Sequence, residues 1–116
     1  MLDEEALRRL RELDPSGQNH LLERVLRAFE TSLVRLAPQM REARQRNDMA
    51  AVRHIAHTVK SSAASVGALR LSRLCAEIEA AARQEACEAM PLLLDDVDRE
   101  FDVVLQAVQP LRGAAT

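Results

Sequence analysis

Apolar residues recur every three or four positions along most of the 116-residue chain, which is the spacing of amphipathic helices. A short segment over 2–13 shows it first, and a longer one follows over about 18–46. Three further segments cover about 48–66, 71–82 and 91–111. No stretch of useful length alternates with the period of two that is typical of a strand. The pattern therefore predicts an all-helical protein.

Residues that begin or end helices separate these segments. The sequence "DPSG" at 14–17 predicts a turn, and Asp48 predicts the N-cap of the third helix, over about 48–66. Gly67 is a plausible helix stop, and Pro91 fits a first helical turn. Pro38 lies inside the 18–46 pattern and is expected to kink that helix or divide it in two, because proline lacks an N–H donor.

One short and four longer helices joined by short loops predict an antiparallel up-down four-helix bundle with a short N-terminal cap helix. Only 2% of the residues are aromatic, so the core must consist mainly of Leu, Val, Ile and Ala, which suits packed helices. The length fits one domain, expected over 1–112, with a frayed tail at 113–116. The pattern does not define the link at 84–89.

The net charge of -2 and the pI of about 5.9 show that the chain lacks the positive electrostatic field with which proteins bind nucleic acid or an anionic membrane. The sequence contains no signal peptide and no apolar run of eighteen residues, so a soluble cytoplasmic protein is expected. A monomer is expected too, since no second long apolar face is left over. Cys75 lies on an apolar helical face, which favours a reduced, buried thiol over a disulfide with Cys87.

The helix predicted over 48–66 places His57 about 160° from Val59 on a helical wheel of 100° per residue. Val59 is the centre of the apolar face, so the imidazole is expected to face solvent. The core face of this helix comprises Val52, Ile55, Ala56, Val59, Ser62, Ala63 and Val66. The outer face comprises Ala50, Arg53, His54, His57, Lys60, Ser61, Ala64 and Ala68.

The outer face beyond His57 is unusual, because small residues occupy positions that solvent-exposed helices usually fill with long polar ones. Ser61, Ala64 and Ala68 leave the imidazole clear and allow another protein to approach. Lys60, the only lysine in the chain, can reach an anion attached to the ring. A neutral imidazole is a nucleophile near pH 7 and can accept a phosphoryl group. The alternative is that His57 is an inert surface residue, as most exposed helical histidines are.

The sequence "AHTVKSSAASVGALRLSRLCAEIEAAAR" at 56–83 resembles the signature of histidine-containing phosphotransfer (HPt) domains of bacterial multistep phosphorelays. That signature is roughly His-x-Leu-Lys-Gly-Ser-Ser-x-x-x-Gly, followed by an amphipathic helix with a Leu-Cys and a Leu-Glu or Ile-Gln pair. The positions that match are His57, Lys60, Ser62, Gly67, Leu74, Cys75, Ile78 and Glu79.

The resemblance implies that His57 is phosphorylated and that Lys60 lies near the phosphate. It implies that an outward-facing Glu79 orients the imidazole through its second nitrogen, although Glu79 could equally be a solvated helix charge. Arg83 matches a basic position one turn further on, where a plain surface charge is the alternative. Ser61 departs from the family's glycine, and its hydroxyl could bind the phosphate or crowd the partner.

The resemblance further implies a phosphoryl carrier, not an enzyme, which takes the group from one receiver-domain aspartate and passes it to another. The partners are then receiver domains of response regulators and, as a further option, a hybrid histidine kinase. Mg²⁺ is expected on the receiver and no cofactor on this chain, whose three glycines form no phosphate-binding loop. The docking face is expected to comprise Arg53, His54, Ala64 and Ala68, with a contribution from the first helix. The N-terminal Met and short tail favour a free-standing protein over an excised kinase domain.

Two other functions stay open on the residues alone. A helical adaptor could bind a signalling partner through the same face with His57 unmodified. A metal site on His54 and His57 lacks a third ligand at a useful spacing, because His20 lies on another segment, so no metal is expected.

Overall fold

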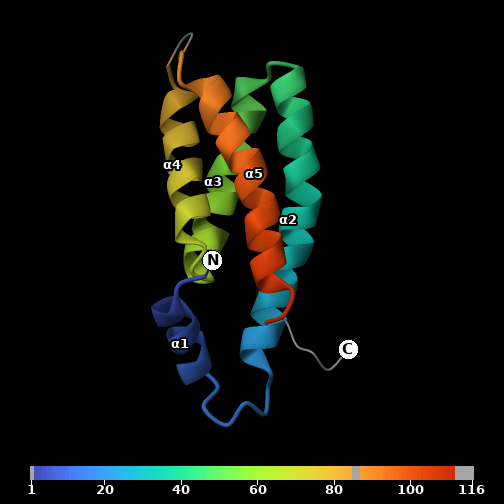
Figure 1. Cartoon of the computed structure of the whole chain (residues 1–116), viewed down its shortest axis with the longest axis vertical. Helices are drawn as coiled ribbons and strands as arrows, with labels where there is room; N and C mark the ends of the chain where they lie inside the picture. Colours follow the sequence, from blue (N-terminus) through green and yellow to red (C-terminus); the bar gives the residue numbers. More distant parts are fainter. Residues whose placement is uncertain (1, 85–86, 112–116) are drawn as a thin grey trace.

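The computed structural model describes residues 2–84 and 87–111, which form helices and no strands, as predicted (Figure 1). The predicted frayed tail at 113–116 lies outside these residues. Four long helices run antiparallel as an elongated bundle, and the short first helix lies at one end of it. The helices are α1 (Glu4–Glu12), α2 (Leu21–Gln45), α3 (Met49–Ser65), α4 (Leu69–Ala81) and α5 (Met90–Val108).

The predicted helix boundaries around α3 are confirmed. The Asp48 side chain accepts a hydrogen bond from the Ala51 N–H at 3.1 Å, which satisfies a backbone donor that has no partner within the helix. Gly67 follows α3 with a φ of 81°, a left-handed conformation that glycine adopts without steric cost. Pro91 lies in the first turn of α5, where its missing N–H breaks no helical hydrogen bond.

The helix predicted to begin at 18 or 19 instead begins at Leu21. The Asp14 carboxylate accepts a hydrogen bond from the Leu21 N–H at 3.2 Å, across the turn that the "DPSG" sequence forms. His20, with a φ of 50°, then reverses the chain into the helix. The turn is longer than expected because Asp14, seven residues before Leu21, accepts the hydrogen bond of the first helical N–H.

Of the two outcomes expected at Pro38, a kink or a division, the division does not occur, because the helix is continuous over Leu21–Gln45 with the proline inside it. An internal proline costs a helix about 3 kcal/mol. Pro38 itself is exposed, whereas Leu36, Ala37 and Met40 on the other face are buried in the bundle. Tertiary packing on both sides of the proline outweighs the lost hydrogen bond.

The core lies along the axis of the four long helices and contains aliphatic residues with few aromatic ones. Between α3 and α4 the buried side chains include three small ones, Ala56, Ala63 and Cys75, each 0% exposed. Small side chains allow two helix backbones to approach closely. Both cysteines are free and Cys75 is buried, as predicted.

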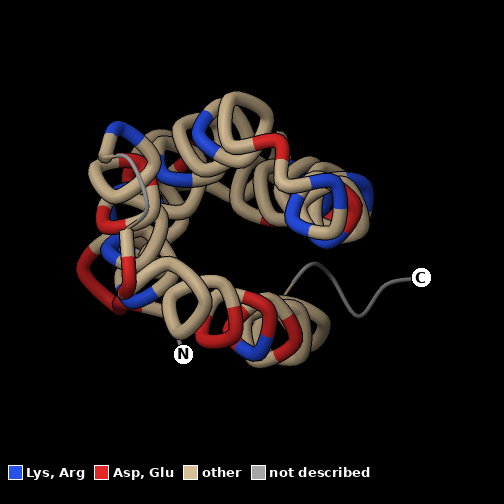
Figure 2. Tube along the Cα trace, turned by 90° about the horizontal axis from the view of Figure 1, so that it is seen from above, with Lys and Arg blue, Asp and Glu red and all other residues tan. Residues whose placement is uncertain are grey.

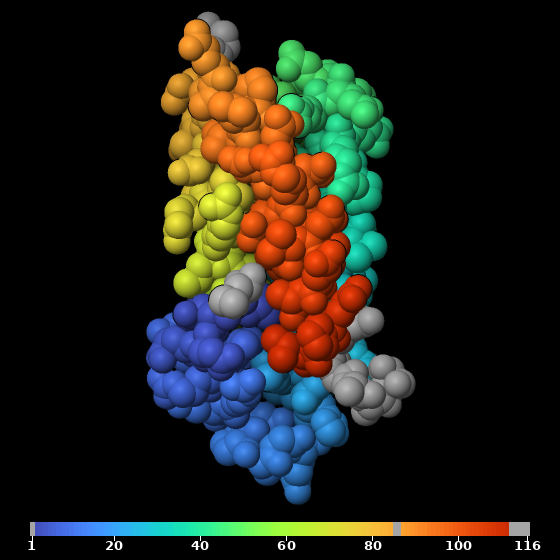
Figure 3. Space-filling model, in the orientation of Figure 1, coloured from blue at the N-terminus to red at the C-terminus, as the bar shows by residue number. Residues whose placement is uncertain are grey.

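The N-terminal segment is tied to the turn between α3 and α4. The Asp3 N–H donates a hydrogen bond to the Gly67 carbonyl at 2.8 Å, and Leu2 and Leu7 are buried. The space-filling view shows residues 2–13 pressed against the end of the bundle (Figure 3). The predicted cap helix is therefore packed against the core.

Charged residues of both signs are distributed around the bundle (Figure 2). Two ion pairs join α2 to α5, Arg41 with Asp98 at 2.5 Å and Arg44 with Asp95 at 2.7 Å. In the part of the chain that the structure describes, no helix is both long enough and apolar enough to cross a membrane.

Candidate functional site

His57 lies in the middle of α3 with its side chain on the solvent side, as the helical wheel predicted. Its side chain is 62% exposed, whereas Val59 on the opposite face is 1% exposed. One ring nitrogen, Nδ1, lies 3.0 Å from the Glu79 Oε2 atom of α4. The imidazole is therefore accessible and also held at one nitrogen.

Glu79 is buried, which corrects the expectation that it faces outward. Only 9% of the residue is exposed, and its carboxylate meets three basic groups, two from α3 and one from the residues just after α4. Oε2 contacts the His57 ring, and Oε1 lies 2.8 Å from the Lys60 Nζ. Arg83 lies further away, with its Nη2 atom 3.7 Å from Oε2. The alternative of a solvated helix charge does not fit this burial.

The physical reason for this burial is the close packing of α3 and α4. Cys75, one turn before Glu79 on α4, is fully buried. Side chains on a helix tilt toward its N-terminus, so a glutamate at position 79 reaches back along the antiparallel α3. A wheel drawn for α4 alone cannot show this, because two of the three partners of Glu79, His57 and Lys60, belong to α3.

The surroundings of Glu79 lower the pKa of its carboxyl group. The hydrogen bond from Lys60 is the largest cause, and the hydrogen bond with His57 acts in the same direction, while burial opposes both. An ionised carboxylate only accepts hydrogen bonds, so the proton of the neutral imidazole is placed on Nδ1. The Nε2 lone pair is then free, on the ring edge away from Glu79.

The other predicted site residues divide into an exposed group and one buried residue. Arg53, His54, Ser61 and Ala64 are exposed on α3 as expected. Ala68 is only 1% exposed, so its expected place on the outer face is wrong. The helix ends at Ser65 and the chain turns at Gly67, so the wheel angle of α3 no longer applies to position 68.

A hollow of about 300 Å³ opens beside the imidazole on the side toward the N-terminus of α3. Lys60, Ser61 and Ala64 follow His57 on the other side, toward the C-terminus of that helix. The residues that line the hollow are Ala50, Arg53, His54, His57, Glu79 and Arg83. Two arginines beside one carboxylate make this hollow favourable for an anion.

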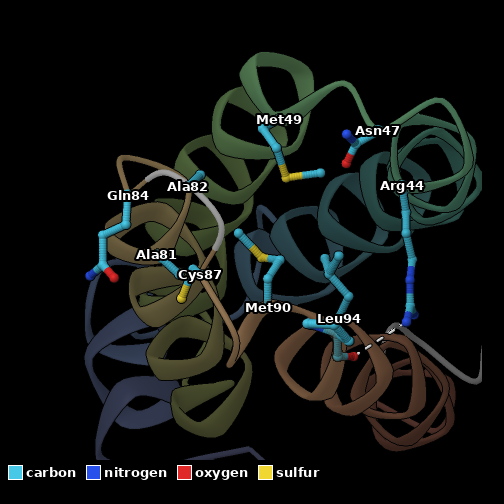
Figure 4. Close-up of a pocket in the computed structure, with 10 residues that line it drawn as sticks. Arg44, Asn47, Met49, Ala81, Ala82, Gln84, Cys87, Met90 and Leu94 are labelled. Carbon is cyan, nitrogen blue, oxygen red and sulfur yellow. Dashed lines mark hydrogen bonds between the residues drawn. The ribbon is translucent and has the colours of Figure 1, made fainter.

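Another hollow, of about 370 Å³, contains none of the predicted site residues (Figure 4). It lies at the end of the bundle away from α1, and its lining includes Met49, Met90 and Leu94. The guanidinium of Arg44 at its edge is paired with Asp95. Arg44 is the charged residue among those that line it, and its pairing leaves no free charge for phosphoryl chemistry. Within the described ranges, no three His, Cys, Asp or Glu residues are grouped as metal ligands.

Comparisons with known proteins identify the family of the chain. The family model "Hpt domain" matches residues 24–108. The structure is similar to the crystal structure of histidine-containing phosphotransfer protein B (HptB) from Pseudomonas aeruginosa PAO1, with a TM-score of 0.83 and 28% sequence identity. That similarity covers 96% of this chain and 93% of the other. A search of curated proteins gives no match. The chain belongs to the Hpt domain family, whose members carry phosphoryl groups in phosphorelays and work with receiver domains.

Proposed function

We propose that His57 accepts a phosphoryl group from a phosphorylated aspartate of one receiver domain and passes it to an aspartate of another. The observation that carries this proposal is that the imidazole is held at one nitrogen and exposed to solvent. Its Nδ1 atom is held by a buried carboxylate at 3.0 Å, while the ring is 62% solvent-exposed. The free Nε2 atom is the nucleophile.

In the forward step the Nε2 lone pair forms a bond to phosphorus, and the bond between phosphorus and the aspartate oxygen breaks. The electron pair of that bond leaves with the receiver's carboxylate. The ring becomes positively charged with its proton still on Nδ1, and the negative charge of Glu79 stabilises it. Transfer to the second receiver reverses these changes. The chain supplies a nucleophile on a rigid helix, so positioning is its main contribution.

The charges around the ring favour the phosphorylated state. Lys60, Arg53 and Arg83 are cationic and Glu79 is anionic, and a phosphoryl group adds negative charge between them. The Lys60 side chain is one-third exposed, and its ammonium, paired with Glu79 at 2.8 Å, can turn toward that group. We propose further that Mg²⁺ belongs to the receiver, where it neutralises charge at the aspartate, and that this chain binds no cofactor.

We propose that the receiver docks on the exposed part of α3 around His57. Ser61 and Ala64 are short and exposed, so they let a partner surface approach the ring. Arg53 and His54 form the edge of this face on the other side of the ring. Ala68 is excluded from it by its burial.

The test is to mix the protein with a phosphorylated receiver and Mg²⁺ and to follow acid-labile label on this chain. Wild type is expected to become labelled, and His57→Gln is expected to stay unlabelled. His54→Gln is a matched control, because it removes another exposed histidine of α3 and should still be labelled. Receiver binding without labelling of wild type would overturn the proposal and support an adaptor. Labelling of His57→Gln would overturn it as well.

A further inference from the structure

The hydroxyl of Ser72 is bonded differently from the other helical hydroxyls near the site. On α3, Thr58 donates to the His54 carbonyl at 3.1 Å, and Ser65 donates to the Ser61 carbonyl at 3.2 Å. Both bonds stay within their own helix, which is the usual local arrangement. Ser72 on α4 instead donates to the carbonyl of Lys60 on α3, at 3.0 Å. This bond connects the two helices that carry the site.

The position of this bond matches the place where Glu79 meets α3. Ser72 and Glu79 are seven residues apart, which places them on the same face of α4 and about 10.5 Å apart along its axis. The Glu79 side chain tilts back toward Ser72 along α4. A helix anchored at the Lys60 carbonyl therefore brings this carboxylate to the side chains of His57 and Lys60.

Ser72 supplies a polar contact between α3 and α4 that does not involve Glu79. The buried side chains of the two helices, among them Ala56, Ala63 and Cys75, are apolar, and apolar packing is not directional as a hydrogen bond is. Among the described residues, the other side-chain hydrogen bond or ion pair contacts between α3 and α4 are those of Glu79 itself. A shift of about 1 Å is enough to spoil such a contact, and misplacements of that size can cost as much as 100-fold in rate.

We propose that Ser72 is a positioning residue for phosphoryl transfer, acting through the register of α4 and hence through Glu79 on His57. It does not touch the reacting atoms. The proposal rests on the proposed function of His57, but its spectroscopic consequence does not. Ser72 holds the carboxylate against Nδ1, which keeps the proton there and leaves Nε2 free.

The first measurement is the NMR spectrum of the His57 ring nitrogens in ¹⁵N-labelled protein at a pH where the ring is neutral. In wild type, Nδ1 is expected to carry the proton and Nε2 to be unprotonated. Ser72→Ala is expected to move both nitrogens toward an average of the two tautomers, and Ser72→Thr, which keeps a hydroxyl, to restore them. Ser65→Ala is the matched control, because it removes a hydroxyl bonded within its own helix, and it should leave the ring signals unchanged. Ser72→Cys, similar in size and a weak donor, replaces Ser72→Ala if that variant does not fold.

The second measurement is the rate of phosphoryl transfer from a phosphorylated receiver. Ser72→Ala is expected to lower the rate about threefold to tenfold, and Glu79→Gln by about 10- to 100-fold, the usual effect of losing an orienting partner. The double variant is expected to be no slower than Glu79→Gln, because Ser72 acts only through that carboxylate.

The inference would be overturned if Ser72→Ala had the ring spectrum and the transfer rate of wild type. It would also be overturned if Ser72→Ala lowered the transfer rate as much in the Glu79→Gln background as it does in wild type. If wild type accepts no phosphoryl group, the proposed function fails, and the ring spectrum alone decides the role of Ser72.

Discussion

Gly67 allows a direct test of how the N-terminal segment is held to the bundle. The residue turns the chain between α3 and α4 with a φ of 81°, and its carbonyl accepts the Asp3 N–H at 2.8 Å. A Cβ atom placed on Gly67 lies 2.7 Å from the Asp3 backbone nitrogen and 2.9 Å from the Asp3 backbone oxygen. Alanine at this position therefore forces the segment before α1 to move.

Two separate costs make up the expected loss of stability in Gly67→Ala. The left-handed conformation costs a residue with a Cβ about 1–2 kcal/mol. Displacement of Asp3 removes one hydrogen bond, worth about 1 kcal/mol, and loosens the burial of Leu2 and Leu7, which we expect to cost about 1 kcal/mol more. The free energy of unfolding should fall by about 3–4 kcal/mol.

Gly17→Ala isolates the first of these costs. Gly17 also has a positive φ, of 73°, but no atom lies within 4 Å of the position that its Cβ would take. Its replacement by alanine should cost only the about 1–2 kcal/mol of the left-handed conformation. The difference between the two variants measures the contact with Asp3.

The assay is urea unfolding followed by circular dichroism, with the slope of the transition compared between variants. We expect Gly67→Ala to lie about 2 kcal/mol below Gly17→Ala, which corresponds to roughly 8 °C in melting temperature for a domain of this size. Hydrogen exchange at the Asp3 amide should accelerate in Gly67→Ala alone. Equal losses in the two variants, with unchanged exchange at Asp3, would refute the steric argument.

Three further predictions concern the thiols, the pH dependence and the docking face. Burial raises the pKa of the Cys75 thiol to about 12, so a thiol reagent at neutral pH should modify the half-buried Cys87 quickly and Cys75 only on unfolding. A count of modified thiols should therefore give two in denaturant and one in its absence. Because the hydrogen bond from Lys60 lowers the pKa of Glu79 from 4.5, its ionised form stabilises the fold above about pH 4.5 and this contribution is lost as the pH falls through the lowered value. Between pH 6 and pH 3, unfolding experiments should therefore show a smaller loss of stability for Glu79→Gln than for wild type, and an equal loss would contradict the role of this ion pair. Ala64→Arg should block phosphoryl transfer and leave the melting temperature unchanged, and normal transfer would remove Ala64 from the docking face.

Much of the fold could be predicted because each helix carries a local signal. The periodic apolar residues predict the helices, and Asp48, Gly67 and Pro91 mark boundaries that the structure confirms. Boundaries that depend on distant atoms were harder to predict. The start of α2 depends on a hydrogen bond to Asp14, and its passage through Pro38 depends on packing against other helices.

The residues of the candidate site also divide into those that one helix predicts and those that depend on packing between helices. The exposure of His57 follows from its angle to the apolar face of one helix, so the wheel was sufficient. Arg83 and Glu79 could be named only through the family resemblance, and the burial of Glu79 became visible only when α4 was packed against α3. Ser72 carried no signal at all in the sequence, because a serine gives no indication of whether its hydroxyl bonds within its own helix or across to another.

The sequence by itself determined the all-helical class, the face of α3 that carries His57, and the single lysine one turn away. These properties depend on residue types and on spacing within one helix, which backbone geometry converts directly into direction. Only the tertiary structure decided that Glu79 is buried against the imidazole, that Lys60 is paired with it, and that Ala68 is withdrawn from the surface. Those properties depend on the distance and register between helices, and side chains far apart in the sequence set both by packing together.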